Sequence, residues 1–290
     1  MGGVSASGGS ILIKTQDEIS RMRDANRIVA HVLNSLIAMI EPGVSTYELD
    51  RMAERISIDA GARPAFKGYR GFPAALCISL NEEVVHGIPS KKRILRLGDV
   101  VSLDFGVLYR GFYGDSAITV GVGELLPRNR QLLQVAEDSL LQGISKALPG
   151  NRVNDISRAI QERVEKEGFS IVRDFVGHGI GRSLHEPPEI PNYAINAPSP
   201  RLRPGMVLAI EPMVNGGSHK VRVLRDGWTV VTSDGSKSAH FEHSVAVTED
   251  GCEVLSARDS ASDFLNVFAQ SVSCSALQRG FDVERGSHRS

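Results

Sequence analysis

An internal repeat of 107 residues restricts the folds open to this chain more than any other feature of its sequence. Pro42 and Pro149, each followed by glycine, are 107 positions apart, and at the same offset LRLGDVVSLD, ending at Asp104, matches LRPGMVLAIE, ending at Glu211. In both copies a helical pattern, a Pro-Gly break and a second helical pattern precede a strand that bears an acid. This order predicts a duplicated unit of two helices and a β-hairpin.

The helices are predicted from their caps and from apolar spacing. Capping boxes at residues 15–18 (TQDE) and 45–48 (STYE) begin the first two helices, apolar residues over 132–144 mark the third, and a fourth ends at Gly168. Two such units facing each other would form one sheet backed by helices, with the acid-bearing strands meeting near a pseudo-twofold axis. We therefore expect a single α+β domain.

The stretch VVSLDFGVLYRGFYGDSAITV (100–120) predicts a hairpin that turns at Arg110-Gly111. This register places Gly106 opposite Asp115, and Asp104, two residues from Gly106, shares their face. Diagonal neighbours on one face of an antiparallel pair lie roughly 7–8 Å apart, so one small object could touch both carboxylates. The alternative is a solvated face with two unrelated acids.

Composition and charge exclude several classes of protein. The net charge is −1 over 290 residues, which provides no overall attraction to nucleic acid or to an anionic membrane, and no stretch reaches the roughly 18 apolar residues of a membrane span. Three cysteines without CxxC spacing favour a reducing compartment over a disulfide scaffold. We expect a cytoplasmic protein with a flexible leader at 1–10, one domain at 11–255 and a partly disordered extension at 256–290.

Two further acids lie in apolar segments of the second unit. VLAIEPMV (207–214) is predicted to be a strand that buries Glu211, and SAHFEHSVAVT (238–248) a strand that carries Glu242. A buried, unpaired carboxylate is costly, so Glu211 requires a cation. His178 lies between two glycines. A lone histidine is more often a core or surface residue than a ligand, but the flanking glycines allow a close approach of the backbone and leave the ring prominent.

If Asp104, Asp115, Glu211 and Glu242 converge, their charge predicts two divalent cations. Four carboxylates packed together would repel one another and several would protonate, whereas two divalent ions balance them. The neutral imidazole of His178 would add a ligand, and oxygen donors with one nitrogen suit Mn, Fe, Co or Zn. A two-metal site lowers the pKa of a water and polarises a carbonyl, so the implied reaction is hydrolysis.

These residues, in this order, resemble those of the methionine aminopeptidases and of the wider group of pita-bread metallopeptidases. The resemblance covers roughly residues 11–255 and rests on CISLNEEVVHGIP, the DFG and YGDS pair, GHGIG with HEPP, IEPMV and FEHS. It implies the pita-bread fold and a catalytic domain over that range. It also implies two divalent metal ions bound by Asp104, Asp115, His178, Glu211 and Glu242.

The resemblance further implies roles for the residues around the metals. Glu211 would be the general base, His86 would position the substrate, and His185 would bind the scissile amide and stabilise the intermediate. The methionine pocket would consist of Tyr69, Phe72, Cys77, Leu184 and Trp228. Cys77 and Trp228 could equally be plain core residues. Leu184 stands where a larger side chain is common in the family, and Phe72 stands where tyrosine is common in some members. These two departures put fine substrate selectivity in question.

The implied activity is removal of the N-terminal methionine from nascent proteins and peptides, with a small second residue favoured. Only 26 positions separate His185 from Glu211, too few for the helical insert of the type II enzymes, so the chain resembles the short bacterial type I form. The expected partners are the N-termini of nascent chains and, transiently, the ribosome, with no specific nucleic acid and no membrane. The expected state is a monomer.

Two other functions compete with this one. A proline-directed peptidase of the same fold would carry a large additional N-terminal domain, whereas here the predicted catalytic unit begins almost at once. A non-catalytic binding protein on the same scaffold would usually lack some of the metal ligands, and this chain has all five.

Overall fold

The computed structural model describes residues 10–258. Its helices are α1 (Gln16–Ile37), α2 (Thr46–Asp59), α3 (Pro127–Ile144) and α4 (Val153–Lys166), with a short 3-10 turn at Tyr69–Gly71. The strands of the first half are β1 (Arg63–Pro64), β2 (Cys77–Leu80), β3 (Glu83–Val85), β4 (Val100–Tyr109) and β5 (Phe112–Gly121). Those of the second half are β6 (Ser170–Ile171), β7 (Gly177–Gly179), β8 (Glu186–Ile190), β9 (Val207–Ile210), β10 (Met213–Asn215), β11 (Val221–Val223), β12 (Val230–Thr232), β13 (Ser238–His240), β14 (Glu242–Val247) and β15 (Cys252–Val254).

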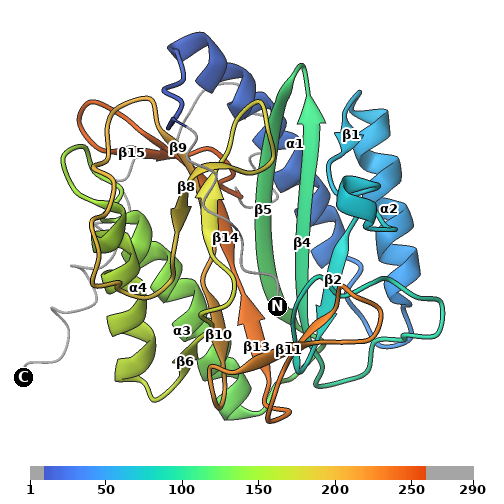
Figure 1. Cartoon of the computed structure of the whole chain (residues 1–290). Helices are drawn as coiled ribbons and strands as arrows, with labels where there is room; N and C mark the ends of the chain where they lie inside the picture. Colours follow the sequence, from blue (N-terminus) through green and yellow to red (C-terminus); the bar gives the residue numbers. More distant parts are fainter. Residues whose placement is uncertain (1–9, 259–290) are drawn as a thin grey trace, which may run out of the picture.

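One antiparallel sheet joins the two predicted units. Its order is β1-β4-β5-β14-β9-β7-β8, with β2 also paired to β4 and β15 to β14. In Figure 1 helix α1 lies beside β4 and β5, α2 lies beside β1, and the two green helices, α3 and α4, lie beside the strands of the second unit. The predicted α+β architecture of duplicated units is therefore confirmed, and the strands that carry the acids are neighbours in the middle of the sheet.

The helices form where their caps predict them. At α1 the Thr15 hydroxyl accepts a hydrogen bond from the Glu18 N–H, and the Glu18 carboxylate accepts one from the Thr15 N–H at 2.9 Å. Ser45 and Glu48 form the same box at α2. The inward face of α1 buries apolar residues that include Met22 and Leu33, and this stripe holds the helix on β4 and β5.

The central hairpin has the predicted register. Tyr109 pairs with Phe112 around the turn at Arg110-Gly111, and Gly106 lies opposite Asp115. Arg110 has φ 48° and Gly111 φ 82°, the left-handed pair that a two-residue hairpin turn requires.

Two predicted strands are broken, and that part of the sequence-based prediction was wrong. VLAIEPMV is β9, then Glu211-Pro212, then β10, while SAHFEHSVAV is β13, then Phe241, then β14. β9 pairs with β14 in the large sheet, and β10 pairs with β13 in a separate sheet with β6. Pro212 has no N–H to continue a ladder, so the first segment leaves the large sheet beside Glu211. The second segment leaves it beside Glu242, where the Phe241 N–H donates to the carbonyl oxygen of Pro212 at 3.3 Å.

The predicted domain limits remain predictions. Residues 1–9 of the leader and 259–290 of the extension lie outside the described residues. Of the extension, Ser256 is buried and its hydroxyl is 2.8 Å from Nδ1 of His243. Among the described residues, no helix combines the length and the apolar character needed to cross a membrane.

Candidate metal centre

The first unit contributes Asp104 from β4 and Asp115 from β5. Asp115 is 4% exposed, and its N–H donates to Oδ1 of Asn26 on α1 at 3.2 Å. A Cβ on Gly106 would lie 3.1 Å from Oδ1 of Asp115 and 3.0 Å from the ring of Phe66. Glycine at this position therefore keeps free the space between the two carboxylates.

The second unit contributes Glu211 from the break after β9, Glu242 from the start of β14 and His178 from β7. Nδ1 of His178 lies 2.9 Å from the carbonyl oxygen of Gly179, so Nδ1–H donates there and Nε2 is left with a lone pair. That Nε2 is 3.5 Å from Oε1 of Glu211. The glycines beside His178 are required by close packing of the backbone, because a Cβ on Gly177 would lie 2.4 Å from the carbonyl oxygen of Ala209.

The donors fit a divalent metal ion. Asp115, His178 and Glu242 each offer one ligand atom, and the three atoms lie within 4.8 Å of one another. Oδ1 of Asp115 and Oε1 of Glu242 are buried without a hydrogen-bond partner. A buried oxygen left bare is costly, and a cation shared by these atoms would satisfy both.

The carboxylates behave as a group whose charge is uncompensated. Burial raises the pKa of Asp104 from 3.8 to about 7 and that of Glu211 from 4.5 to about 7. Burial first, and then repulsion by the neighbouring carboxylates, raises the pKa of Asp115 and of Glu242 well above the ordinary values. Such shifts are typical of functional sites and are relieved when a cation binds.

One cavity of about 150 Å³ brings the predicted residues together. Its lining residues are Asp104, Asp115, His178, Glu211 and Glu242, with His86, His185, Tyr69, Phe72, Cys77, Leu184 and Trp228 and two further residues, Phe66 and Arg70. The lining combines four carboxylates with apolar and aromatic side chains, among which the rings of Phe72 and Trp228 lie edge to face at 5.2 Å.

The two further histidines are neutral at the cavity wall. Burial lowers the pKa of His86 to about 4 and, with the positive charge of nearby Arg70, that of His185 to about 3. Nδ1 of His185 is 2.9 Å from the Tyr69 hydroxyl, and its ring lies 4.2 Å from that of His178. His86 has φ 59°, a strained backbone conformation for a residue other than glycine.

Several residues of the site were not predicted from the sequence. His240 is 2% exposed, and its Nε2 lies 3.6 Å from Oε2 of Glu211. Its position two residues before Glu242 is a signal that could have identified it, since alternate strand residues share a face. Asn26, Phe66 and Arg70 have no comparable signal, because they reach the site through packing between distant segments.

Comparison with known proteins agrees with this geometry. Residues 20–249 match metallopeptidase family M24. The chain is 53% identical to methionine aminopeptidase 1 of Bacillus subtilis over 245 residues, which are 84% of this chain and 98% of that protein, and 51% identical to a methionine aminopeptidase of Clostridium perfringens.

Solved structures extend the comparison. A methionine aminopeptidase from Thermotoga maritima superposes with a TM-score of 0.84 at 47% identity, covering 85% of this chain and 99% of that one. The prolidase of Pyrococcus furiosus shares the fold alone, with a TM-score of 0.71 at 24% identity over 66% of its length. The chain therefore belongs to metallopeptidase family M24, with the bacterial methionine aminopeptidases.

Proposed function

We propose that this protein removes the N-terminal methionine from nascent proteins and peptides by hydrolysis at a centre of two divalent metal ions. One observation carries the proposal: acids from both units and His178 line the same cavity as a set of apolar and aromatic side chains. The cavity volume of about 150 Å³ is below the roughly 300–1,000 Å³ of pockets for drug-sized ligands. A single side chain at the end of a peptide suits such a space.

Asp104, Asp115, His178, Glu211 and Glu242 would hold the two ions, which we expect to be Mn, Co, Fe or Zn. When bound, such ions polarise the substrate carbonyl and lower the pKa of a water molecule. Two divalent charges also balance the four carboxylates. The buried, partnerless oxygens of Asp115 and Glu242 support this donor set.

The protein's own residues would then carry the proton transfers. Glu211, between His178 and His240, accepts the proton of the attacking water as general base. With the Tyr69 hydroxyl donating to Nδ1 of His185, that imidazole carries its proton on Nε2 and donates it to the oxygen on which negative charge develops. His86 borders the cavity beside Trp228, with ring centroids 6.1 Å apart, and would orient the peptide.

The apolar and aromatic residues of the cavity lining would select the methionine side chain. Tyr69, Phe72, Cys77, Leu184 and Trp228 supply aromatic and aliphatic surface and one sulfur, which suit a flexible thioether. Crowding at the cavity mouth would favour a small second residue.

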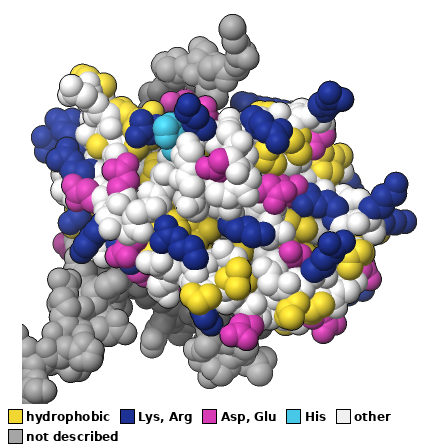
Figure 2. All heavy atoms as spheres, turned by 90° about the horizontal axis from the view of Figure 1, so that it is seen from below, with side chains coloured by type: hydrophobic (Ala, Val, Ile, Leu, Met, Phe, Trp, Pro, Cys, Tyr) yellow, Lys and Arg dark blue, Asp and Glu magenta, His cyan; other side chains and the backbone are white. Residues whose placement is uncertain are grey.

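We place this activity in the cytoplasm, with a monomer acting on chains that emerge from the ribosome. The net charge of −1 provides no overall attraction to nucleic acid or to an anionic membrane. On the face shown in Figure 2, basic and acidic side chains are intermixed with apolar ones.

The test measures release of free methionine from Met-Ala-Ser, with Ala-Pro-Ser and Met-Lys-Ser as controls. Chelated protein should be inactive, and Mn or Co should restore cleavage of Met-Ala-Ser alone, with about two ions bound per chain by elemental analysis. Preference for Ala-Pro-Ser would instead favour the proline-directed function. Metal-loaded protein that cleaves none of the three peptides would exclude the proposed reaction.

A further inference from the structure

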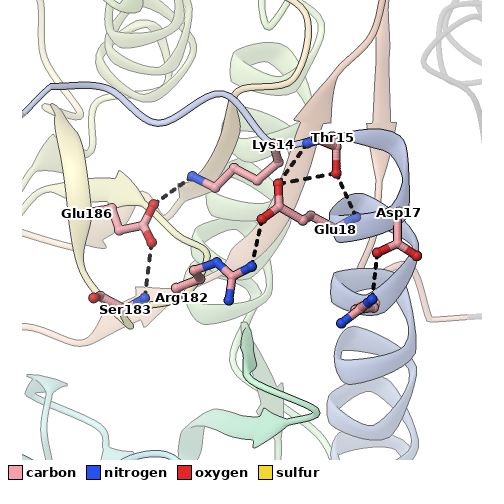
Figure 3. Close-up of polar contacts among 8 residues, drawn as sticks. Lys14, Thr15, Asp17, Glu18, Arg182, Ser183 and Glu186 are labelled. Carbon is pink, nitrogen blue, oxygen red and sulfur yellow. Dashed lines mark hydrogen bonds and ion pairs between the residues drawn. The ribbon is translucent and has the colours of Figure 1, made fainter.

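Residues 10–18, here called the N-terminal strap, precede residues 20–249, which match the model of the family. The strap lies against the second unit, with the N–H of Lys14 donating to the carbonyl oxygen of Gly205 at 2.8 Å. A Cβ on Gly205 would lie 2.6 Å from Cγ2 of Ile13. This close fit directs the Lys14 side chain into the protein, toward the loop that carries Leu184 and His185 (Figure 3).

Lys14 forms a buried ion pair with Glu186. Nζ of Lys14 is 2.6 Å from Oε2 of Glu186, and the two side chains are 5% and 4% exposed. Oε1 of the same carboxylate accepts a hydrogen bond from the Ser183 N–H at 3.0 Å. One carboxylate therefore binds the strap with one oxygen and closes the loop from Ser183 to Glu186 with the other.

A second ion pair holds the same loop from the first turn of α1. Nη2 of Arg182 is 3.0 Å from Oε1 of Glu18, whose Oε2 completes the cap at Thr15. The Lys14–Glu186 pair packs closely against the start of this loop, because a Cβ on Gly181 would lie 2.5 Å from Cε of Lys14 and 2.8 Å from Oε1 of Glu186. Leu184 and His185 lie between these anchored residues.

We propose that Lys14 and Glu186 are positioning residues, which hold His185 and Leu184 in place against the metal centre. This inference rests on the proposed function. A buried ion pair contributes little net stability compared with an apolar pair of similar size, although removing one partner alone is strongly destabilising. The ordering of the loop that carries His185 is an effect that an apolar pair would not reproduce, since it could not bind the Ser183 N–H.

The test separates stability from catalysis. Lys14→Met and Glu186→Leu should each lower the midpoint of thermal unfolding, because each leaves a buried charge without its partner. The double variant Lys14→Met/Glu186→Leu should recover most of that midpoint while kcat for Met-Ala-Ser stays about 10- to 100-fold below wild type. Its metal content should be unchanged, and the Ser183 amide should exchange its hydrogen faster.

A matched pair of variants tests the second ion pair, between Arg182 and Glu18. Arg182→Ala, which loses the Glu18 contact to the loop, should lower kcat. Arg21→Ala should not, because Arg21, which is exposed like Arg182, pairs with Asp17 at 2.7 Å within α1 and does not touch the loop.

A double variant with wild-type kcat and unchanged exchange at Ser183 would overturn the positioning role. Wild-type protein that releases no methionine would instead refute the proposed function, and the exchange at Ser183 would still report whether the strap orders the loop.

Discussion

The carboxylates of the cavity differ in how much the protein itself satisfies them. Oε1 and Oε2 of Glu211 lie 3.5 Å from His178 and 3.6 Å from His240, respectively, whereas Oδ1 of Asp115 and Oε1 of Glu242 have no hydrogen-bond partner. The last two oxygens therefore depend on a bound cation. Glu211 faces two imidazoles at distances longer than a hydrogen bond, and Nε2 of His240 is itself buried without a hydrogen-bond partner.

Glu211→Gln should reduce kcat for Met-Ala-Ser by about 10²- to 10⁴-fold, since glutamine keeps the shape but cannot accept the proton. The measurement is methionine release under saturating metal, with thermal unfolding to verify the fold. Glu165→Gln, an exposed residue on α4, is the matched control and should keep full activity. Unchanged turnover in Glu211→Gln would refute its role as general base.

The pH dependence of the stability of the metal-free protein follows from the buried carboxylates of the cavity. Asp104 and Glu211, with pKa values raised from 3.8 and 4.5 to about 7, still bind protons near pH 6.5 in the folded chain but not in the unfolded chain. His86 and His185, with pKa values lowered from 6.5 to about 4 and 3, act in the opposite direction, because they bind protons in the unfolded chain but not in the folded chain, and their effect is largely complete above pH 6.5. The carboxylates therefore contribute stability that is lost as the pH rises through about 7.

The midpoint of thermal unfolding of chelated protein should accordingly fall from pH 6.5 to 8, and adding Mn near pH 7 should restore it with release of protons. Calorimetry in buffers of different ionisation enthalpy measures that release. Metal binding without proton release near pH 7 would contradict the raised pKa values.

Among the elements, the most informative feature is the shared break in two strands. On one side of the break β9 pairs with β14 in the large sheet, and on the other side β10 pairs with β13 in a different sheet. The break places Glu211 in the cavity lining and brings Nε2 of His240 to 3.6 Å from its Oε2. Helix α1 contributes in the same way by close packing, since Asn26 binds the Asp115 N–H.

Gly114→Ala tests that packing. A Cβ there would lie 2.8 Å from the backbone nitrogen of Asn26, so α1 must move away from β5. We expect the free energy of unfolding to fall by about 1–3 kcal/mol, measured with urea, and metal affinity to fall because Asn26 no longer orients Asp115. Gly111→Asn is the control: its φ of 82° suits asparagine and no atom lies within 4 Å of its Cβ, so the change should stay under about 0.5 kcal/mol. Equal effects of the two variants would contradict the packing argument.

In the large sheet the two halves of the molecule meet at a short seam between β5 and β14, beside the metal centre, while β3 and β12 join the halves in another sheet. β5 and β14 share only the pairs Glu242 with Ala117 and His243 with Ser116. Hydroxyl groups add hydrogen bonds across the seam, including Oγ of Ser244 to the carbonyl oxygen of Asp115 at 2.8 Å. Metal ions bound by acids from both units would therefore join the halves as well as serve catalysis.

Ser244→Ala and Ser139→Ala distinguish the seam from the rest of the core. Each removes a buried hydroxyl worth about 1 kcal/mol, but Ser139 bonds to Ala136 within α3. Adding Mn should raise the unfolding midpoint of both variants. Only Ser244→Ala should change the size of that increase, because only the Ser244 hydroxyl binds the backbone of a proposed metal ligand, Asp115. The same metal-induced increase in both variants would show that the seam and the metal centre are independent.

Much of the site could be predicted from the sequence. The hairpin register that places Gly106 opposite Asp115 followed from alternation and one turn, and the helix starts followed from their capping boxes. These features depend on interactions between residues a few positions apart, and the 107-residue repeat extended them to the second unit. All of the predicted site residues line one cavity, while their individual roles remain predictions.

By itself, the sequence determined the local elements, the donor types and the charge that calls for cations, because caps, turns and alternation act over short separations. Only the tertiary structure decided where the strands break, that His240 and Asn26 support Glu211 and Asp115, and that Lys14 reaches Glu186 across 172 positions. Such contacts arise from packing and pairing between distant segments, whose free energy depends on the whole fold and leaves no periodic pattern in the chain.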